Sequence, residues 1–172
     1  MDAAKYSVTE LLRDGSRIEI RALKPTDRDQ LQGAVGRMSD ESIQRRFFAP
    51  KRHFSEREID FFLNVDFVNH VALVAVLNVE GRPLIVGGGR YIVIQPGIAE
   101  VAFGLDDTYQ GRGIGGLLMK HLSVIAREGG LRQLVAEVLP GNVAMLSVFK
   151  KAGLEMTTKR ESGVAHVTLQ LP

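Results

Sequence analysis

The chain has 172 residues, 45% of them hydrophobic, and its 22 basic and 20 acidic residues leave a formal net charge of +2. It contains no cysteine, which excludes disulfides, thiolate metal ligands and a thiol nucleophile and favours a cytoplasmic protein. A chain of this size can bury roughly two thirds of its unfolded surface in one core. We therefore expect a single domain over residues 1–172, with residues 1–16 as a loosely ordered N-terminal extension.

Strand and helix signals alternate through the N-terminal half. Residues 17–23 alternate between polar and apolar side chains, as a half-buried strand does. Three helix starts follow, each marked by a hydroxyl side chain that can accept from backbone N–H groups, at Thr26, Ser39 and Ser55. Ser55 is followed three residues later by Glu58, the pattern of a capping box.

The middle of the chain predicts three strands and a long helix. Residues 70–94 form two β-rich runs joined at Glu80-Gly81, which is a hairpin by its turn chemistry. Residues 98–105 give the next strand. A glycine-rich loop then leads into apolar residues at helical spacing, which continue until Gly129-Gly130 ends the helix.

The C-terminal part predicts a strand over residues 133–139, a helix from Asn142 to Ala152 and a hairpin over residues 154–171 that turns at Ser162-Gly163. The expected order is therefore β, α, α, α, β, β, β, α, β, α, β, β. This order indicates a mixed α/β or α+β fold.

Charge and histidine spacing exclude several classes of partner. The basic clusters, such as Arg45-Arg46 and Lys150-Lys151, are short and lack interleaved aromatic residues, so they are read as solvated faces and nucleic acid is not an expected partner. The longest apolar run, Val71 to Leu77, is too short to span a bilayer, so no membrane is expected. The histidines lack the spacing of metal ligands, so we expect no metal site; they are His53, His70, His121 and His166.

The glycine-rich loop before the long helix indicates a phosphate-binding site, because bare backbone and a helix N-terminus together bind anions. A Walker P-loop is excluded, since no Gly-Lys-Ser/Thr sequence ends the motif. A dinucleotide fingerprint fits Gly111, Gly113 and Gly116, with Glu137 about twenty residues on. That alternative is disfavoured because residues 106–110 separate the strand from the loop and a hairpin precedes it.

A third interpretation covers more of the chain. Residues 110–115, QGRGIG, match Q/R-x-x-G-x-G/A, and the chain here resembles the GNAT superfamily of acyl-CoA-dependent N-acyltransferases. Residues 99–122 resemble that family's fourth strand and third helix, and residues 138–154 its fifth strand and fourth helix. The resemblance implies one GNAT-like domain: a mixed sheet of about seven strands, splayed between the fourth and fifth, flanked by about four or five helices.

The resemblance also implies where acetyl-CoA, the cosubstrate, is held. The pantetheine arm would insert beside the main chain of residues 103–105, and the backbone donors of residues 112–116 would take the diphosphate, with the Arg112 side chain adding charge. The implied binding residues are Phe103, Gly104, Leu105, Gln110, Gly111, Arg112, Gly113, Ile114, Gly115, Gly116, Asn142 and Phe149.

Acyl transfer to an amine needs a base, because an alkyl ammonium has a pKa of about 10.4. Glu100 is the only acid in its apolar strand, and in GNAT protein acetyltransferases a glutamate in a similar Ala-Glu context is the general base. We expect Glu100 to be buried beside Val101 and Phe103, with a solvent-facing strand start as the alternative. Members of this superfamily commonly use a tyrosine to protonate the departing thiolate, and Phe149 stands at the matching position here. Tyr91, Tyr109 and solvent are the remaining candidates for the proton donor.

The acceptor site is the part on which the sequence is least informative. Residues 38–50 and 53–76 resemble bacterial Pat-type protein lysine acetyltransferases, whose targets include AMP-forming acyl-CoA synthetases. The resemblance implies a protein lysine as acceptor; a small amine, or a catalytically silent acyl-CoA sensor, are the alternatives. It also allows a homodimer. Five aromatic residues are expected in the core, namely Phe47, Phe48, Phe61, Phe62 and Phe67.

Overall fold

The structure is a computed structural model that describes residues 1–47 and 54–172. Phe48 and His53, and the expectations attached to them, lie outside the described residues. The strands are β1 Ser7–Leu11, β2 Arg17–Ala22, β3 His70–Val79, β4 Arg82–Gln95, β5 Ile98–Leu105, β6 Gln133–Val138, β7 Glu155–Glu161 and β8 Val164–Gln170. The helices are α1 Arg28–Gly36, α2 Asp40–Phe47, α3 Glu56–Leu63, α4 Ile114–Glu128 and α5 Val143–Lys151, with short 3-10 turns η1 Ala3–Lys5, η2 Pro25–Asp27 and η3 Asp107–Tyr109.

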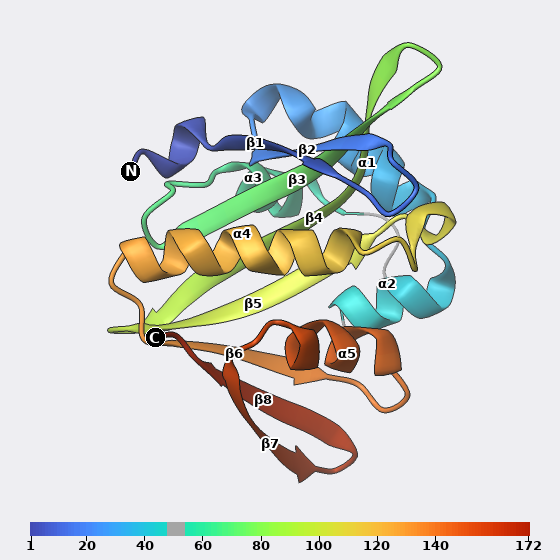
Figure 1. Cartoon of the computed structure of the whole chain (residues 1–172). Helices are drawn as coiled ribbons and strands as arrows, with labels where there is room; N and C mark the ends of the chain where they lie inside the picture. Colours follow the sequence, from blue (N-terminus) through green and yellow to red (C-terminus); the bar gives the residue numbers. More distant parts are fainter. Residues whose placement is uncertain (48–53) are drawn as a thin grey trace.

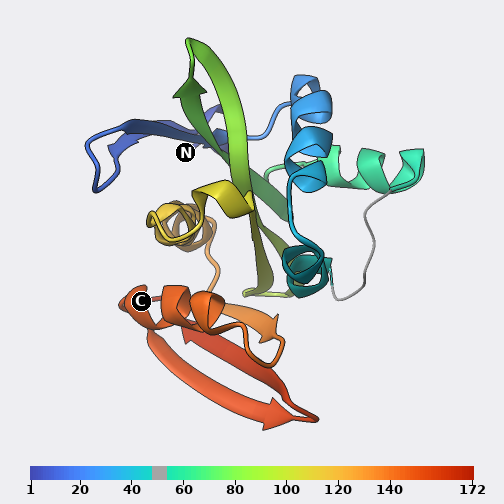
Figure 2. The same cartoon turned by 90° about the vertical axis from the view of Figure 1, so that its right-hand side faces the viewer.

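The described strands form one eight-stranded sheet in the order β1-β2-β3-β4-β5-β6-β8-β7 (Figure 1). β5 and β6 pair in parallel, and the other neighbouring strands described here pair antiparallel. Figure 2 shows α1, α2 and α3 on one face of the sheet and α4 on the other, while β6, β7 and β8 turn away from the remaining strands. The expected fold class, a single mixed α/β domain with a splayed sheet, is confirmed.

The eighth strand comes from the N-terminal segment, for which the expectation of loose order is wrong. β1 pairs with β2 from Ser7 opposite Arg21 to Leu11 opposite Arg17. Tyr6 fixes its start, because the Tyr6 hydroxyl lies 2.5 Å from Nδ1 of His121, a buried residue of α4. The strand shows little apolar alternation because it lies at the edge of the sheet, so its sequence gives a weak signal.

The first helix start also differs from the expectation. Thr26 lies inside η2, and α1 begins at Arg28. Asp27 organises this turn, because its carboxylate accepts from the Lys24 N–H at 2.8 Å and from two Arg21 nitrogens at 2.8 and 2.9 Å. A buried carboxylate therefore determines the turn in place of the threonine hydroxyl.

The start of α3 and the turn between β3 and β4 have the local structure that the sequence predicts. Ser55 Oγ accepts from the Glu58 N–H at 3.2 Å, and Glu58 Oε1 accepts from the Ser55 N–H at 3.1 Å, which confirms the capping box of α3. The turn residues Glu80 and Gly81 have φ angles of 53° and 78°, as a two-residue hairpin with both central residues left-handed requires.

Two apolar layers hold the helices on the sheet. The larger one packs α4 against the face that carries Leu73, Val101 and Phe103. The smaller one lies under α1 and α3 and contains Leu23, Ala72, Val74, Val76 and Ile85. Phe67 packs against the larger layer, but Phe61 is 53% exposed, so the expectation that it lies in the core is wrong.

Asp106 connects α1 to the end of β5, directly before the glycine loop. The residue is only 2% exposed, and its carboxylate accepts from Arg37 Nε at 2.5 Å and from the Thr108 N–H at 3.0 Å. Its own N–H donates to the Val86 carbonyl at 2.8 Å. This pairing fixes the direction in which the chain leaves β5.

We predict that Asp106→Asn lowers the free energy of unfolding by about 2 kcal/mol, because a buried charged hydrogen bond loses its charge while the backbone cap is kept. Urea denaturation followed by circular dichroism measures the change. The control is Glu155→Gln at the exposed start of β7, which should leave the midpoint unchanged. A wild-type midpoint for Asp106→Asn would contradict the prediction.

Candidate active site

The candidate site lies where β5 and β6 part. The two strands pair only from Ile98 opposite Gln133 to Glu100 opposite Val135. β5 then continues to Leu105 with β4 on one side and no strand on the other, so its backbone groups on that side are free of the ladder. A cleft of about 620 Å³ opens between the strands and is bordered by the glycine loop and α5.

The glycine loop presents backbone donors at the mouth of this cleft. Gly111 and Gly113 have φ angles of 78° and 87°, a left-handed conformation that glycine adopts without a steric penalty. Gly113 is the N-cap of α4, and the Leu117 N–H is bonded to the Gly113 carbonyl at 3.2 Å. The N–H groups of residues 114–116 precede that bond and carry the positive end of the helix dipole. These groups fit the diphosphate of a nucleotide-containing carrier.

Close packing brings α4 and α5 together at the cleft. A Cβ added to Gly115 would lie 3.2 Å from Cγ2 of Val148, a tight contact, so the glycine favours the close approach of the two helices. A Cβ on Gly116 would meet nothing within 4 Å, and Gly116 faces the cleft directly. Gly115 therefore has a packing role and Gly116 leaves space.

The walls of the cleft include most of the residues expected from the sequence. Those that line it are Glu100, Phe103, Gly104, Leu105, Gln110, Gly111, Gly113, Ile114, Gly115, Gly116, Asn142 and Phe149. Phe149 is 1% exposed and packs against Phe103 with ring centroids 6.2 Å apart. Asn142 caps α5, because its Oδ1 accepts from the Met145 N–H at 3.3 Å.

A glycine in β4 makes room for this aromatic floor. A Cβ at Gly89 would lie 2.7 Å from Cδ1 of Phe103, which real side chains do not allow. Gly89 thus lets Phe103 lie across β4, and Gly87 does the same for Leu105, whose Cδ2 would clash with a Cβ at that position. The sequence alone does not reveal this role of the β4 glycines, because the role depends on which residues of β5 lie opposite them.

Arg112 is the expected residue that does not line the cleft. Its guanidinium lies over the Tyr109 ring, 5.2 Å from the centroid, and 4.0 Å from Asp14 of the β1–β2 turn. Gln110 does line the cleft, but its amide nitrogen donates to Ser42 Oγ at 3.2 Å and so ties the loop to α2. The side chain of Arg112 is therefore turned toward the loop's own surface.

Glu100 lines the cleft but is exposed, so the expectation that it is buried is wrong. Its strand alternates: Val101 and Phe103 pack toward α4, whereas Glu100 shares the opposite face with Ala102 and Gly104. Arg46 of α2 is its charged neighbour. Burial lowers the pKa of Arg46 to about 10, and the negative charge of Glu100 partly offsets that effect.

Neither alternative tyrosine lines the cleft. Tyr91 is 2% exposed and belongs to the larger apolar layer, where burial raises the pKa of its hydroxyl to about 12. Tyr109 lies under the Arg112 guanidinium. Solvent is the proton source that this arrangement leaves open to a departing thiolate.

Basic residues of the cleft were missed by the sequence reasoning. Arg13, Arg45, Arg46 and Lys151 line it, although they come from the β1–β2 turn, α2 and α5. The sequence interpretation placed Lys150-Lys151 on a solvated face, and Arg45-Arg46 on a solvated helix face or at the rim of an acceptor groove. Only the tertiary arrangement shows that three separate segments bring cations to one cleft.

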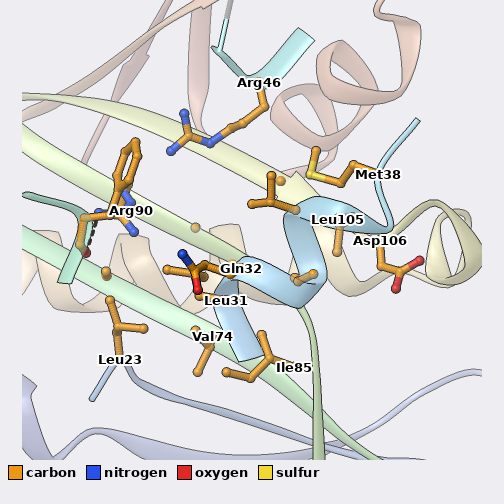
Figure 3. Close-up of a pocket in the computed structure, with 18 of the residues that line it drawn as sticks. Leu23, Leu31, Gln32, Met38, Arg46, Val74, Ile85, Arg90, Leu105 and Asp106 are labelled. Carbon is orange, nitrogen blue, oxygen red and sulfur yellow. Dashed lines mark hydrogen bonds between the residues drawn. The ribbon is translucent and has the colours of Figure 1, made fainter. Parts of the chain in front are cut away.

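A second, smaller pocket adjoins the cleft on the side of α1, α2 and α3. It has a volume of about 90 Å³, and its apolar wall includes Leu23, Val74 and Ile85 (Figure 3). Five residues line both spaces: Met38, Arg46, Ala102, Gly104 and Leu105. The pocket therefore continues from the face of β5 that carries Glu100.

Arg90 lines the pocket from β4, and His70 of β3 lies next to it. Arg90 Nη1 lies 2.9 Å from Nε2 of His70 and donates to the Phe62 carbonyl at 3.0 Å. Burial and the neighbouring Arg90 lower the pKa of His70 to about 4, so its ring is neutral at physiological pH and accepts from the guanidinium.

A sheet that parts beside a glycine loop at a helix N-terminus is the arrangement of a domain that can bind a phosphate-containing ligand in the cleft. The model of the Acetyltransferase (GNAT) family matches residues 39–154, and the chain belongs to this family. It is 32% identical over 137 residues to Acetyltransferase PA5475 of Pseudomonas aeruginosa, covering 79% of this chain and 74% of that protein.

Two further relatives are of the Pat kind. The crystal structure of the GNAT domain of S. lividans PAT has a TM-score of 0.86 and 36% sequence identity, covering 96% of this chain and 97% of that one. Acetyltransferase Pat of Mycolicibacterium smegmatis is 28% identical over 165 residues, or 94% of this chain. The matched region is only 48% of the length of that relative. The chain is thus an acetyl-CoA-dependent N-acetyltransferase.

Within the described residues, no three or more histidine or acidic side chains gather in a way that could hold a metal ion. No helix of the described part has both the length and the apolar character needed to cross a membrane.

We predict that Gly116→Leu weakens CoA binding at least tenfold, because a side chain would fill the space before the amides of α4. The fold should hold, since leucine favours a helix over glycine by roughly 0.8 kcal/mol. Titration calorimetry with CoA measures the affinity. The matched control is Gly36→Leu on α1, an exposed position where an added Cβ also meets nothing within 4 Å. Undiminished CoA binding by Gly116→Leu would refute the placement.

We also predict that stability falls as the pH drops from about 6.5 toward 4. An unfolded histidine takes up its proton near pH 6.5, whereas folded His70 resists protonation until about pH 4. The unfolded state therefore binds more protons in this window, which costs the fold up to about 3 kcal/mol. Urea denaturation at several pH values should show a smaller dependence for His70→Gln. His166→Gln, on β8, serves as the control; equal slopes for all three proteins would contradict the assignment.

Proposed function

We propose that this enzyme transfers the acetyl group of acetyl-CoA to the side-chain amine of a lysine on a protein, with Glu100 as general base. The observation that carries the proposal is the position of Glu100 at the last paired position of β5 and β6, where it lines the cleft two residues from Ala102, which lines both the cleft and the second pocket. A carboxylate there reaches an amine that approaches from the side of α1, α2 and α3.

The amides of residues 114–116 would hold the diphosphate of acetyl-CoA, and the free edge of residues 101–105 would hydrogen-bond the pantetheine arm. Arg13, Arg45 and Lys151 line the same cleft and add positive charge toward the phosphates. The volume of about 620 Å³ lies in the range of small-molecule sites. When bound, acetyl-CoA supplies the activated thioester carbonyl.

The chemistry is direct transfer. Glu100, through a water molecule or directly, removes a proton from the substrate ammonium. The neutral nitrogen forms a bond to the acetyl carbon, and the carbon–sulfur bond breaks. The sulfur leaves as a thiolate, which takes a proton from solvent because no tyrosine lines the described part of the cleft. The nitrogen loses its second proton as the amide forms.

Support for a protein lysine comes from the relatives, and support for a small amine comes from the small volume of the second pocket, about 90 Å³. The 36% identity to the S. lividans PAT domain favours an acceptor of the kind that Pat-type enzymes modify, such as an acyl-CoA synthetase. The lack of cysteine is consistent with activity in the cytoplasm. A homodimer through an exposed sheet edge is a further part of the proposal.

We predict that Glu100→Gln lowers kcat by roughly 10²- to 10⁴-fold, the usual contribution of a general base. Affinity for CoA should stay unchanged, because the amide donors of α4 are untouched. Thiol release with an amine panel measures turnover, and calorimetry measures affinity. Glu155→Gln on the exposed start of β7 is the control with the same chemical change. A Glu100→Gln enzyme with wild-type kcat would remove this residue from the mechanism.

A further inference from the structure

The second pocket ends on two guanidinium groups. Arg46 reaches it from α2 and Arg90 from β4, and Figure 3 shows both at the same end of the pocket, opposite the apolar residues Val74 and Ile85. The hydrogen-bond partners of Arg90 are uncharged: the Phe62 carbonyl and the neutral ring of His70. Among the described residues, no carboxylate lies within ion-pair distance of Arg90.

The other charges around the pocket are already paired. Asp106 accepts from Arg37, and Arg28 contacts Glu56 and Asp60. Among the described residues, these acids therefore do not balance the charge of Arg90.

The lowered pKa of Arg90 supports a confined positive charge at this end of the pocket. Burial and the charge of Arg46 lower the pKa of Arg90 to about 9. Arg90 still carries its charge at neutral pH, so the pocket holds two confined cations at a cost in desolvation. A bound anion would reduce that cost.

The strand register fixes where such an anion would lie relative to the reaction. Arg90 is opposite Ala102, and Glu100 is opposite Ile92, so Arg90 and Glu100 occupy diagonal positions on one face of β4 and β5. Diagonal Cβ atoms in an antiparallel pair are roughly 7–8 Å apart. An anionic group at Arg90 and an amine at Glu100 can therefore belong to one molecule, only a few bonds apart.

We propose that the second pocket binds a carboxylate of the acceptor molecule, so that the preferred acceptors are amines with a carboxylate close by. The carboxylate comes either from a free amino acid or from an acidic residue next to the target lysine. A guanidinium fork matches a carboxylate in geometry and charge. This inference rests on the proposed function, since it defines the acceptor of the same site.

The first experiment compares matched acceptors in a thiol-release assay with acetyl-CoA. Free amino acids are paired with their amides, and lysine peptides with aspartate before the lysine are paired with peptides that have asparagine there. Converting the acid to an amide lowers the pKa of an amino acid's amine, which favours the amide. A preference for the acid thus cannot come from the amine itself. We expect kcat/KM to be at least tenfold higher for the acid in one of the two sets, which identifies the source of the carboxylate.

The variants test whether the pocket causes this preference. Arg90→Gln should bring the ratio of acid to neutral acceptor close to one, mainly through KM, while Arg82→Gln, on the exposed start of the same strand, should keep it. Arg90→Lys keeps the charge without the fork and should keep part of the preference; it replaces Arg90→Gln if that variant does not fold. Equal kcat/KM within both wild-type sets, or a preference that survives in Arg90→Gln and Arg90→Lys, would overturn the proposal.

A binding measurement separates this inference from the proposed function. N-acetylglycine and N-acetylglycinamide are titrated into the protein in the presence of CoA, with thermal stability as the readout. Stabilisation by the acid alone, lost in Arg90→Gln, supports the carboxylate pocket even where no amine is acetylated, a result that would contradict only the proposed function. Equal responses to the acid and the amide, in a protein that binds CoA and acetylates amines, would contradict only the pocket.

Discussion

The site depends on the short pairing between β5 and β6. Only three residues of each strand face one another, and beyond Glu100 the strands part. Had the ladder continued, the backbone of residues 101–105 would be satisfied by β6 and the cleft would be absent. α5 and the glycine loop fill the angle between the strands without closing it, because Gly115 allows α4 and α5 to approach while Gly116 leaves space.

Successive side chains of β5 point to opposite faces of the sheet, so the strand contributes to the core under α4 on one face and faces α2 on the other. Val101 and Phe103 pack under α4 and fix β5 in place, while Glu100, Ala102 and Gly104 point to the opposite side, where α2 contributes Arg46. A slip of one residue in the register would bury Glu100 under α4. The glycines of β4 oppose such a slip, since Gly89 has to face Phe103 for the ring to fit.

The sequence allowed prediction of those features that neighbouring residues determine. The capping box at Ser55 and Glu58, the hairpin turn at Glu80 and the glycine loop each need only a few consecutive residues, so their signals are local. The exposure of Glu100 and the meeting of Arg46 with Arg90 depend on residues far apart in the chain. β1 escaped prediction for a similar reason, because its order comes from pairing with β2 and from the contact of Tyr6 with His121.

In the proposed mechanism, the two guanidinium groups near Glu100 also affect the acceptor amine. A positive charge nearby disfavours the ammonium form, so Arg46 and Arg90 would lower the pKa of an amine held at Glu100 and make its deprotonation easier. The same cations would repel an incoming ammonium. A carboxylate on the acceptor resolves this conflict, because it brings the amine in as part of a molecule that the guanidiniums attract. An exposed Glu100 then suffices as the proposed base, because an ammonium group with a lowered pKa gives up its proton more readily.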